Sequence, residues 1–166
     1  MRLVVGDHVS LFNNNSGEWK SEIVDIKNNF LIAKTISQVS PPQSETSIDL
    51  MFSPIKYQNS ESIIRQSTEM GIRSIFPTIF KRTISTKINL SKFNTYAIGA
   101  AQQSERLSIP NIHDLNDLKN QSKIISSKTI LMFDENLKGI HLSKAKMKSN
   151  SEILVVIGPE GGFEEE

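Results

Sequence analysis

The sequence contains no cysteine, which excludes a disulfide framework and a zinc site built on thiolates. No apolar run approaches the roughly 20 residues that a membrane-spanning helix needs. At the N-terminus, Asp7 and His8 interrupt the apolar residues before the core of a secretion signal could form. None of His8, His113 and His141 has a second histidine or an acid at the spacing of a metal-binding motif. We therefore expect a cytoplasmic protein with no membrane partner and no metal ion.

An excess of charge of one sign is also missing. The 19 Lys and Arg residues nearly balance the 18 Asp and Glu residues, and the formal net charge is +1. Bulk charge therefore does not mark a nucleic-acid-binding protein, although basic side chains can still gather on one face. With 166 residues, of which 37% are hydrophobic, the chain can build one domain or two small ones around a buried core.

The first 40 residues have the pattern of short antiparallel strands. Apolar and polar residues alternate in DHVSLF and SEIVDI, and NNFLIAKTI is a third run. The clusters NNNSG and KNN between these runs are rich in residues that tolerate positive φ, which favours hairpin turns. In SPPQSET, at residues 40–46, two prolines remove backbone donors and interrupt strand pairing. We expect a domain boundary there, with a β domain at 1–46 and a second domain at 47–166.

From residue 47 onward the pattern changes to alternating strands and helices. The helical patterns are SESIIRQSTEMG, which ends on a glycine suited to a left-handed C-terminal position, and LSKFNTYAIGAAQQSER, which carries one apolar face. The predicted strands are SIDLMFSPI, IRSIFPTIF, KTILMFDEN and SEILVVIG. The last two are continuous apolar runs, typical of strands buried on both faces of a parallel sheet. This order predicts an α/β domain behind the small β domain.

The loop IGPEGGFEEE follows the last predicted strand, where ligands of α/β sheets bind. Gly161 and Gly162 let the chain turn and let a ligand approach bare backbone. A polyphosphate fits poorly, because the loop has no lysine and Glu160 would repel it. A ligand with a neutral or cationic body, recognised mainly by backbone groups, is the better match. A plain strand-to-helix turn with no ligand is the alternative at this point.

Four stretches of the chain resemble the bacterial 16S ribosomal RNA uridine N3-methyltransferases of the SPOUT superfamily. They are RLVVGD, TEMGIRSIFP at 68–77, AAQQSERLSIP at 100–110 and IGPEGGFEEE, and they occur in the order of that family over essentially the whole chain. The resemblance implies a PUA-like, RNA-binding β-barrel domain followed by an α/β domain with a trefoil knot. It also implies S-adenosylmethionine as methyl donor, 16S ribosomal RNA or the small ribosomal subunit as partner, and a homodimer with its active site near the subunit interface.

The resemblance also assigns roles to individual residues. Arg106 matches the arginine of its motif, and we expect it to stabilise the developing anion or to position a phosphate. Arg2 and Arg82 also match positions of the family. We expect Arg2 to contact RNA from the β domain, and disorder at the start of the chain is the alternative. We expect Arg82 to bind an RNA phosphate or the partner subunit, and a solvated surface charge is the alternative. The expected contacts of the cofactor are Met132, Phe133, Ile157, Gly158, Pro159, Glu160, Gly161 and Gly162.

The chain departs from the family pattern at several points. Members begin upstream of RLVVGD and continue past GPEGG to a Leu-Arg-Thr-Glu-Thr-Ala motif that threads the knot, so we expect a fragment of a longer enzyme with an incomplete knot. Gln66, Lys81 and Gln102 stand where the family tends to have lysine, glutamate and glutamate. A methyltransferase is the first hypothesis. A catalytically inactive remnant that binds RNA or a partner, and a small nucleotide-binding α/β protein, are the alternatives.

Overall fold

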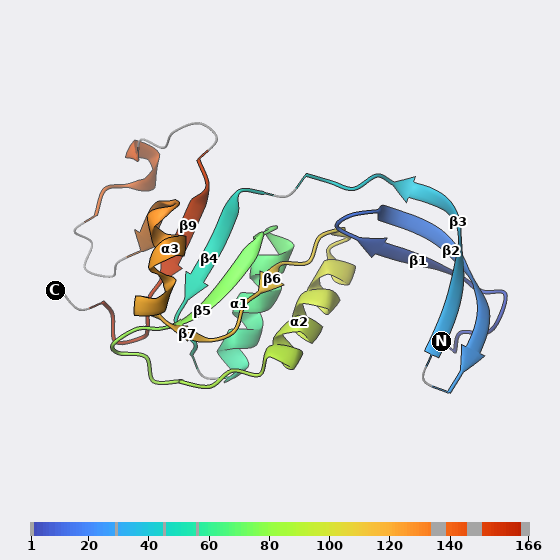
Figure 1. Cartoon of the computed structure of the whole chain (residues 1–166), viewed down its shortest axis with the longest axis horizontal. Helices are drawn as coiled ribbons and strands as arrows, with labels where there is room; N and C mark the ends of the chain where they lie inside the picture. The colour runs from blue at the N-terminus through green and yellow to red at the C-terminus, as the bar shows by residue number, and fades with distance from the viewer. Residues whose placement is uncertain are drawn as a thin grey trace. The chain divides into compact units, whose positions relative to one another are not determined.

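The structure is a computed structural model, which describes residues 2–28, 30–44, 46–55, 57–133, 139–145 and 151–163 (Figure 1). The chain forms two compact units. One comprises Met1–Ser44 with Leu107–Ile109, and the other comprises Glu45–Arg106 with Pro110–Glu166. Within the described ranges, no helix combines the length and the apolar character needed to cross a bilayer.

The first unit is a three-stranded antiparallel sheet, as the alternating pattern predicted. Its strands are β1 (His8–Asn13), β2 (Gly17–Lys27) and β3 (Phe30–Ser40), paired in the order β1-β2-β3. Asn13 closes the first hairpin, because its Oδ1 accepts hydrogen bonds from the amides of Asn15 at 2.9 Å and Ser16 at 2.7 Å. Gly17 follows with φ +73, and a Cβ there would lie 2.6 Å from the backbone carbon of Pro41, so only glycine fits.

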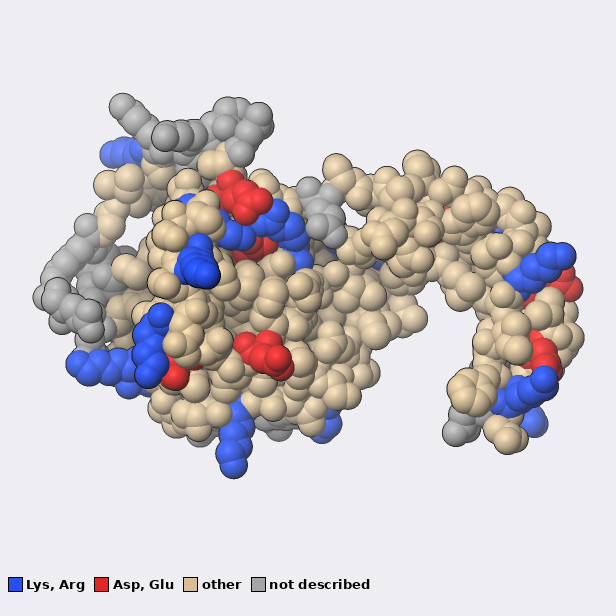
Figure 2. Space-filling view, viewed as in Figure 1, with Lys and Arg blue, Asp and Glu red and all other residues tan. Residues whose placement is uncertain are grey.

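The sheet of the first unit buries little apolar surface. Among its described side chains Ile23 is the large apolar one that is fully buried. Figure 2 shows lysine and acid side chains interspersed along this unit, and residues 1–44 contain four basic and four acidic residues. Its surface is therefore not a basic stripe. The exposed large apolar residues of β2 and β3 are Val24, Ile26, Phe30, Leu31, Ile32, Ile36 and Val39.

The second unit is built on a parallel sheet with the order β6-β5-β4-β9-β8. A further strand, β7, pairs with the carboxyl end of β5. The strands are β4 (Ile48–Phe52), β5 (Ser74–Ile79), β6 (Asn111–Ile112), β7 (Asn116–Asp117), β8 (Thr129–Phe133) and β9 (Ile153–Ile157). The four strands predicted from apolar runs are thus present, whereas the two-residue strands β6 and β7 carry no such run and were not predicted.

Helix α1 (Tyr57–Glu69) ends as its sequence predicted. Gly71 has φ +80, its amide donates to the Thr68 carbonyl at 3.0 Å, and the next amide, of Ile72, reaches back to Ser67 at 3.0 Å. This pair of bonds satisfies carbonyls that the last helical turn leaves open. A glycine at this position therefore fixes where the helix stops.

Helix α2 (Leu90–Gln103) begins at Asn89, whose Oδ1 accepts a hydrogen bond from the Lys92 amide at 3.0 Å. The face predicted to be apolar is buried, and its buried members are Phe93, Ala97, Ala100 and Ala101. Small side chains on that face let α2 lie close against α1, which Figure 1 shows beside it.

Short helical segments follow β7 and were not predicted. They are the 3-10 turn η1 (Leu118–Gln121), helix α3 (Ser122–Ser126) and the 3-10 turn η2 (Leu142–Lys144). Ile124 and Ile125 of α3 pack against a core that includes Met51 and Phe76. Because side chains alternate along a strand, Leu50, Phe52 and Ile75 face the other side of the sheet, where Figure 1 shows α1 and α2.

Burial on both faces, expected for the last two strands, is wrong for β8. Met132 is 55% exposed and Phe133 is 56% exposed, whereas Leu154 of β9 is fully buried. The reason is strand order, because β8 is the edge strand of the sheet and β9 has a neighbour on each side. A continuous apolar run therefore did not distinguish an edge strand from a central one.

Candidate functional site

The glycine loop, residues 158–163, leaves the sheet at the point where strand order reverses. The chain passes outward from β4 through β5 to β6, and it returns on the other side of β4 with β9. Ile157, the last residue of β9, pairs with Phe52 at the end of β4 and with Phe133 at the end of β8. Such a switch point leaves a crevice outside the carboxyl ends of the strands, and ligands of open α/β sheets bind there.

The glycine loop has a defined turn. The Gly162 amide donates to the Pro159 carbonyl at 2.9 Å, and Gly162 has φ +72, which a residue with a Cβ rarely adopts. The Phe163 ring lies against Gly158 so closely that a Cβ there would be 2.7 Å from the ring carbon Cζ. The same ring packs edge-on against Phe80, with 5.6 Å between centroids. The acids predicted to follow this turn lie outside the described residues.

Two neighbouring loops hold the start of the glycine loop in place. The Ser53 amide, just after β4, donates to the Ile157 carbonyl at 3.0 Å. The buried hydroxyl of Ser53 also pairs with Thr83 Oγ1 at 2.8 Å. Thr83 in turn accepts from the Phe80 amide at 2.8 Å, which closes the turn after β5. These contacts join the loops after β4, β5 and β9 into one braced edge.

The groups at this edge suit a ligand with an apolar body and a positive charge. Phe133 and Ile157 are register partners on adjacent strands, so their side chains share a face, and they are 56% and 43% exposed. Glu160 is the charged residue among residues 158–163, and its exposed carboxylate favours a cation over a phosphate. S-adenosylmethionine has a flat adenine ring that can lie on apolar side chains and a positively charged sulfonium, and both features are compatible with these residues.

The structure brings the predicted cofactor residues together at one edge of the sheet. Met132 ends β8 beside Phe133, and residues 157–162 end β9 and form the glycine loop next to them. Arg82 joins them, because its Nη1 donates to the Gly161 carbonyl at 2.7 Å. Arg2 belongs to the other unit, where it is exposed ahead of β1.

Arg106 lies at the opposite end of the second unit's sheet. A Cβ on Gly71, three residues before β5 begins, would lie 2.6 Å from Arg106 Cζ, so the guanidinium covers the C-terminus of α1. Arg106 Nη1 lies 3.4 Å from the Glu69 carbonyl, and its Nε is buried without a hydrogen-bond partner. Within one chain the structure therefore does not bring Arg106 to the glycine loop, and its catalytic role stays a prediction.

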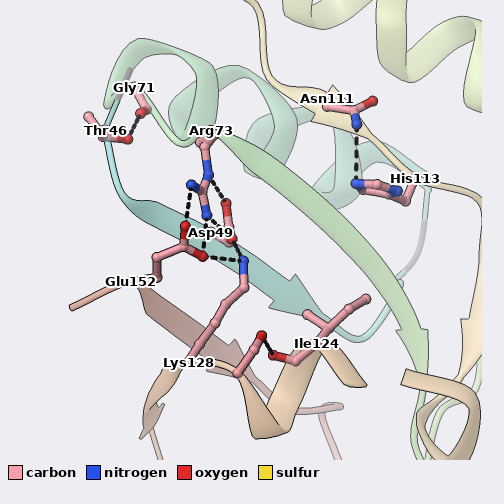
Figure 3. Close-up of polar contacts among 10 residues, drawn as sticks. Thr46, Asp49, Gly71, Arg73, Asn111, His113, Ile124, Lys128 and Glu152 are labelled. Carbon is pink, nitrogen blue, oxygen red and sulfur yellow. Dashed lines mark hydrogen bonds and ion pairs between the residues drawn. The ribbon is translucent and has the colours of Figure 1, made fainter. Parts of the chain in front are cut away.

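A charge network occupies the amino ends of the same strands (Figure 3). Arg73 donates from Nε and Nη2 to the two oxygens of Asp49 at 3.0 and 2.8 Å. It also donates from Nη1 and Nη2 to the two oxygens of Glu152, each at 2.9 Å. Lys128 Nζ bonds Asp49 and lies 3.2 Å from Glu152 Oε2. Two cations thus neutralise two acids where β4, β5, β8 and β9 begin.

The network shifts the pKa values of its members. Burial alone raises the pKa of Asp49, but hydrogen bonds from Arg73 and Lys128 outweigh it and hold that pKa below its usual value. The hydrogen bond from Arg73 lowers the pKa of Glu152 to about 2. The pKa of Arg73 is raised by the hydrogen bond to Glu152 and then by the one to Asp49. Asp49, Glu152 and Arg73 therefore stay charged at neutral pH, and none of these three groups is poised to exchange protons.

Sequence reasoning missed the residues that brace the site. Ser53 and Thr83 are 30 residues apart, and a serine or threonine next to a strand gives no signal of a distant partner. Asp49 and Arg73 are 24 residues apart, and Glu152 is a further 79 residues along the chain. The one available signal for Asp49 was a charged residue inside an apolar strand, which must be paired if it is buried.

Comparison with known proteins identifies the family. Residues 42–166 match the family model described as RNA methyltransferase domain, and residues 1–36 match the model described as RNA methyltransferase PUA domain. The chain belongs to the RNA methyltransferase family. The antiparallel β unit followed by a parallel α/β domain, which the resemblance implied, is thereby confirmed.

Individual members of the family cover more sequence than this chain. Ribosomal RNA small subunit methyltransferase E of Rickettsia conorii is 31% identical over 165 residues, which cover 98% of this chain and 67% of the relative. The protein of the same name from Synechocystis is 23% identical over 172 residues, which cover 98% of this chain and 55% of that relative. The chain thus spans between about half and two thirds of the length of these two relatives.

A solved structure from the family shares the fold. The crystal structure of Ribosomal RNA small subunit methyltransferase E from Neisseria gonorrhoeae, bound to S-adenosyl methionine, matches with a TM-score of 0.81 at 20% sequence identity. The match covers 99% of this chain and 70% of that one. The fold of this chain is therefore also the fold of a protein whose crystal structure contains S-adenosyl methionine.

Proposed function

We propose that this chain transfers a methyl group from S-adenosylmethionine to N3 of a uridine in 16S ribosomal RNA. The observation that carries the proposal is the braced glycine loop at the switch point between β4 and β9. Membership of the RNA methyltransferase family and the cofactor bound by the relative from Neisseria gonorrhoeae support the choice of cofactor. The choice of uridine N3 in 16S ribosomal RNA rests on the resemblance of the four sequence motifs to those of the uridine N3-methyltransferases.

The residues of the site have three tasks in this proposal. Backbone groups of residues 157–162 bind the cofactor, and Phe133 offers an apolar side chain on the face of Ile157 beside them. The side chain of Met132, the preceding residue of β8, faces the other side of the sheet. The exposed carboxylate of Glu160 favours a cationic centre over a phosphate. The cofactor supplies a methyl group on a positively charged sulfur. A bond forms between uridine N3 and the methyl carbon as the sulfur–methyl bond breaks, and the N3 proton passes to solvent.

Catalysis then depends mainly on alignment of nucleophile and methyl group, and on positive charge near the uracil oxygens. Arg106 is the residue that the resemblance offers for the second task. Arg106 lies away from the glycine loop of its own chain, so this role requires that Arg106 of one chain reach the glycine loop of a partner chain. We propose a homodimer for this reason and because the resemblance implies one.

The β unit is the proposed contact for ribosomal RNA, with residues 1–46 as the RNA-binding domain and 47–166 as the methyltransferase domain. Residues 1–46 contain four basic and five acidic residues, so this domain carries no excess of positive charge. Its contribution to RNA affinity should therefore be less sensitive to salt than that of a basic domain, since fewer counterions are released. The absence of cysteine is consistent with the proposed cytoplasmic location.

Calorimetric titration of S-adenosylmethionine into the folded chain tests the cofactor assignment, with ATP as the matched control ligand. The proposal requires one binding site per chain for S-adenosylmethionine, competition by S-adenosylhomocysteine, and no heat of binding for ATP. Binding of ATP alone would favour a nucleotide-binding protein. Transfer of a tritiated methyl group to small ribosomal subunits tests the reaction itself. Binding of the subunits without methyl transfer would favour the alternative of a catalytically inactive, RNA-binding remnant.

A further inference from the structure

Arg82, in the connection between β5 and α2, contacts a single peptide unit of the glycine loop. Its Nη1 donates to the Gly161 carbonyl at 2.7 Å, although the two residues are 79 positions apart. Its aliphatic stem lies against the same residue, because a Cβ on Gly161 would lie 3.4 Å from Arg82 Cδ and 3.5 Å from Arg82 Cβ. The side chain therefore makes both a charged and an apolar contact with the loop.

The peptide unit between Gly161 and Gly162 is held at both of its polar ends. Its carbonyl accepts from Arg82, and its N–H, on Gly162, donates to the Pro159 carbonyl at 2.9 Å. Glycine on both sides leaves this unit with little steric resistance to rotation. The two hydrogen bonds, and not side-chain packing within the loop, therefore set the direction in which its backbone groups point.

The turn that carries Arg82 is itself fixed on both sides. Before it, Phe80 packs edge-on against Phe163 at the end of the glycine loop. After it, Thr83 bonds Ser53, whose amide bonds the Ile157 carbonyl at the start of the same loop. Arg82 is thus presented from a braced turn, so little conformational freedom of the backbone is lost when it holds Gly161.

We propose that Arg82 is a positioning residue for the cofactor loop, which orients the Gly161–Gly162 peptide before the cofactor arrives. This inference rests on the proposed function for the identity of the ligand that the loop binds. The contacts between Arg82 and the loop do not depend on that function. It gives Arg82 a task different from the RNA contact expected from the sequence. Preorganised backbone groups bind a ligand more tightly, because the cost of ordering them is not incurred on binding.

Three variants separate the contacts of Arg82. Arg82→Met keeps an apolar stem and removes every donor, whereas Arg82→Lys keeps a positive charge and one donor group. Lys87→Ala removes an exposed charge from the same connection between β5 and α2 and serves as the control. We expect Arg82→Met to raise the Kd of S-adenosylmethionine about tenfold and Arg82→Lys about threefold, since a bond from a charged donor is lost or weakened. Lys87→Ala should leave it unchanged.

Amide hydrogen exchange of the protein without cofactor gives a second measurement that does not depend on the proposed function. Exchange at residues 158–163 is expected to be faster in Arg82→Met than in Arg82→Lys and the wild type, with unchanged exchange in β4 and β9. Unchanged exchange in the glycine loop would overturn the inference, whatever the cofactor result. If the wild-type chain binds no S-adenosylmethionine but exchange responds as expected, the proposed function fails and the positioning role of Arg82 stands.

Binding of a 16S ribosomal RNA fragment, measured without cofactor, distinguishes positioning from phosphate contact. We expect Arg82→Met to bind the fragment as the wild type does, with the same dependence of affinity on salt. A weaker affinity together with a shallower salt dependence would identify Arg82 as a phosphate contact. If Arg82→Met binds RNA more weakly in this way but keeps the wild-type Kd for S-adenosylmethionine, the positioning role is also overturned.

Discussion

Asp49 and Arg73 form a two-point ion pair that joins β4 to the start of β5. The guanidinium donates to both carboxylate oxygens at 3.0 and 2.8 Å, and the Asp49 side chain is fully buried. Lys128 and Glu152 extend the pair to the starts of β8 and β9. This network lies at the amino edge of the second unit's sheet, while the glycine loop occupies the carboxyl edge.

Asp49→Asn is expected to destabilise the second unit by about 3 kcal/mol, because it removes the buried carboxylate between Lys128 and Arg73 and leaves these two partly buried cations with Glu152 alone. Urea unfolding measures the change. The control is Glu61→Gln, which removes the half-exposed pair with Arg65 within α1 and should cost no more than about 0.5 kcal/mol. Similar small losses in both variants would show that the buried network contributes little to stability.

Acid should weaken the same network. The pKa of Glu152 is lowered from 4.5 to about 2, mainly by the hydrogen bond from Arg73. A carboxylate with a lowered folded pKa contributes stability that is present above pH 4.5 and is lost as pH falls towards 2. We therefore expect the free energy of unfolding of the wild type to fall more steeply between pH 5 and 2.5 than that of Glu152→Gln. Parallel curves would rule out this linkage.

Replacement of Gly71 and of Gly99 by alanine should change the free energy of unfolding in opposite directions. Gly71 has φ +80, and its Cβ would displace the Arg106 guanidinium, so Gly71→Ala should lower the free energy of unfolding by about 1 to 3 kcal/mol. Gly99 lies inside α2, and its nearest added contact would be Arg65 Nη1 at 3.6 Å. Gly99→Ala should therefore stabilise by roughly 0.5 to 1 kcal/mol. Thermal unfolding of both variants checks the contrast, and a stabilising Gly71→Ala would contradict the structure.

Gly158→Ala should damage the cofactor loop more than the fold. The added Cβ would lie 2.7 Å from Phe163 Cζ, so the ring must shift and its edge-on contact with Phe80 is disturbed. We expect about a tenfold higher Kd for S-adenosylmethionine, measured by calorimetry, with little change in unfolding temperature. Gly139→Ala is the matched control, because no atom lies within 4 Å of its added Cβ. Equal Kd values for the two variants would show that the packing of Phe163 does not affect cofactor binding.

The sequence predicted local structure well where one residue decides it. Gly71 ends α1 because of its own backbone freedom, and the apolar face of α2 is read from the spacing of Phe93 and Ala97. The prediction was wrong for the burial of β8, and α3 was missed because its few apolar residues, Ile124 and Ile125, form no periodic run. Edge position and short helices depend on neighbours that local patterns do not contain.

The sequence by itself determined the kinds of element, their order along the chain, and the positions where only glycine can turn the backbone. It also contained the motifs by which the family is recognised. Only the tertiary structure decided that β9 lies beside β4, that Arg82 reaches Gly161, and that Arg106 lies at the other end of the sheet. The physical reason is that these contacts join residues far apart in sequence, and strand order, which periodicity does not encode, sets which of them meet.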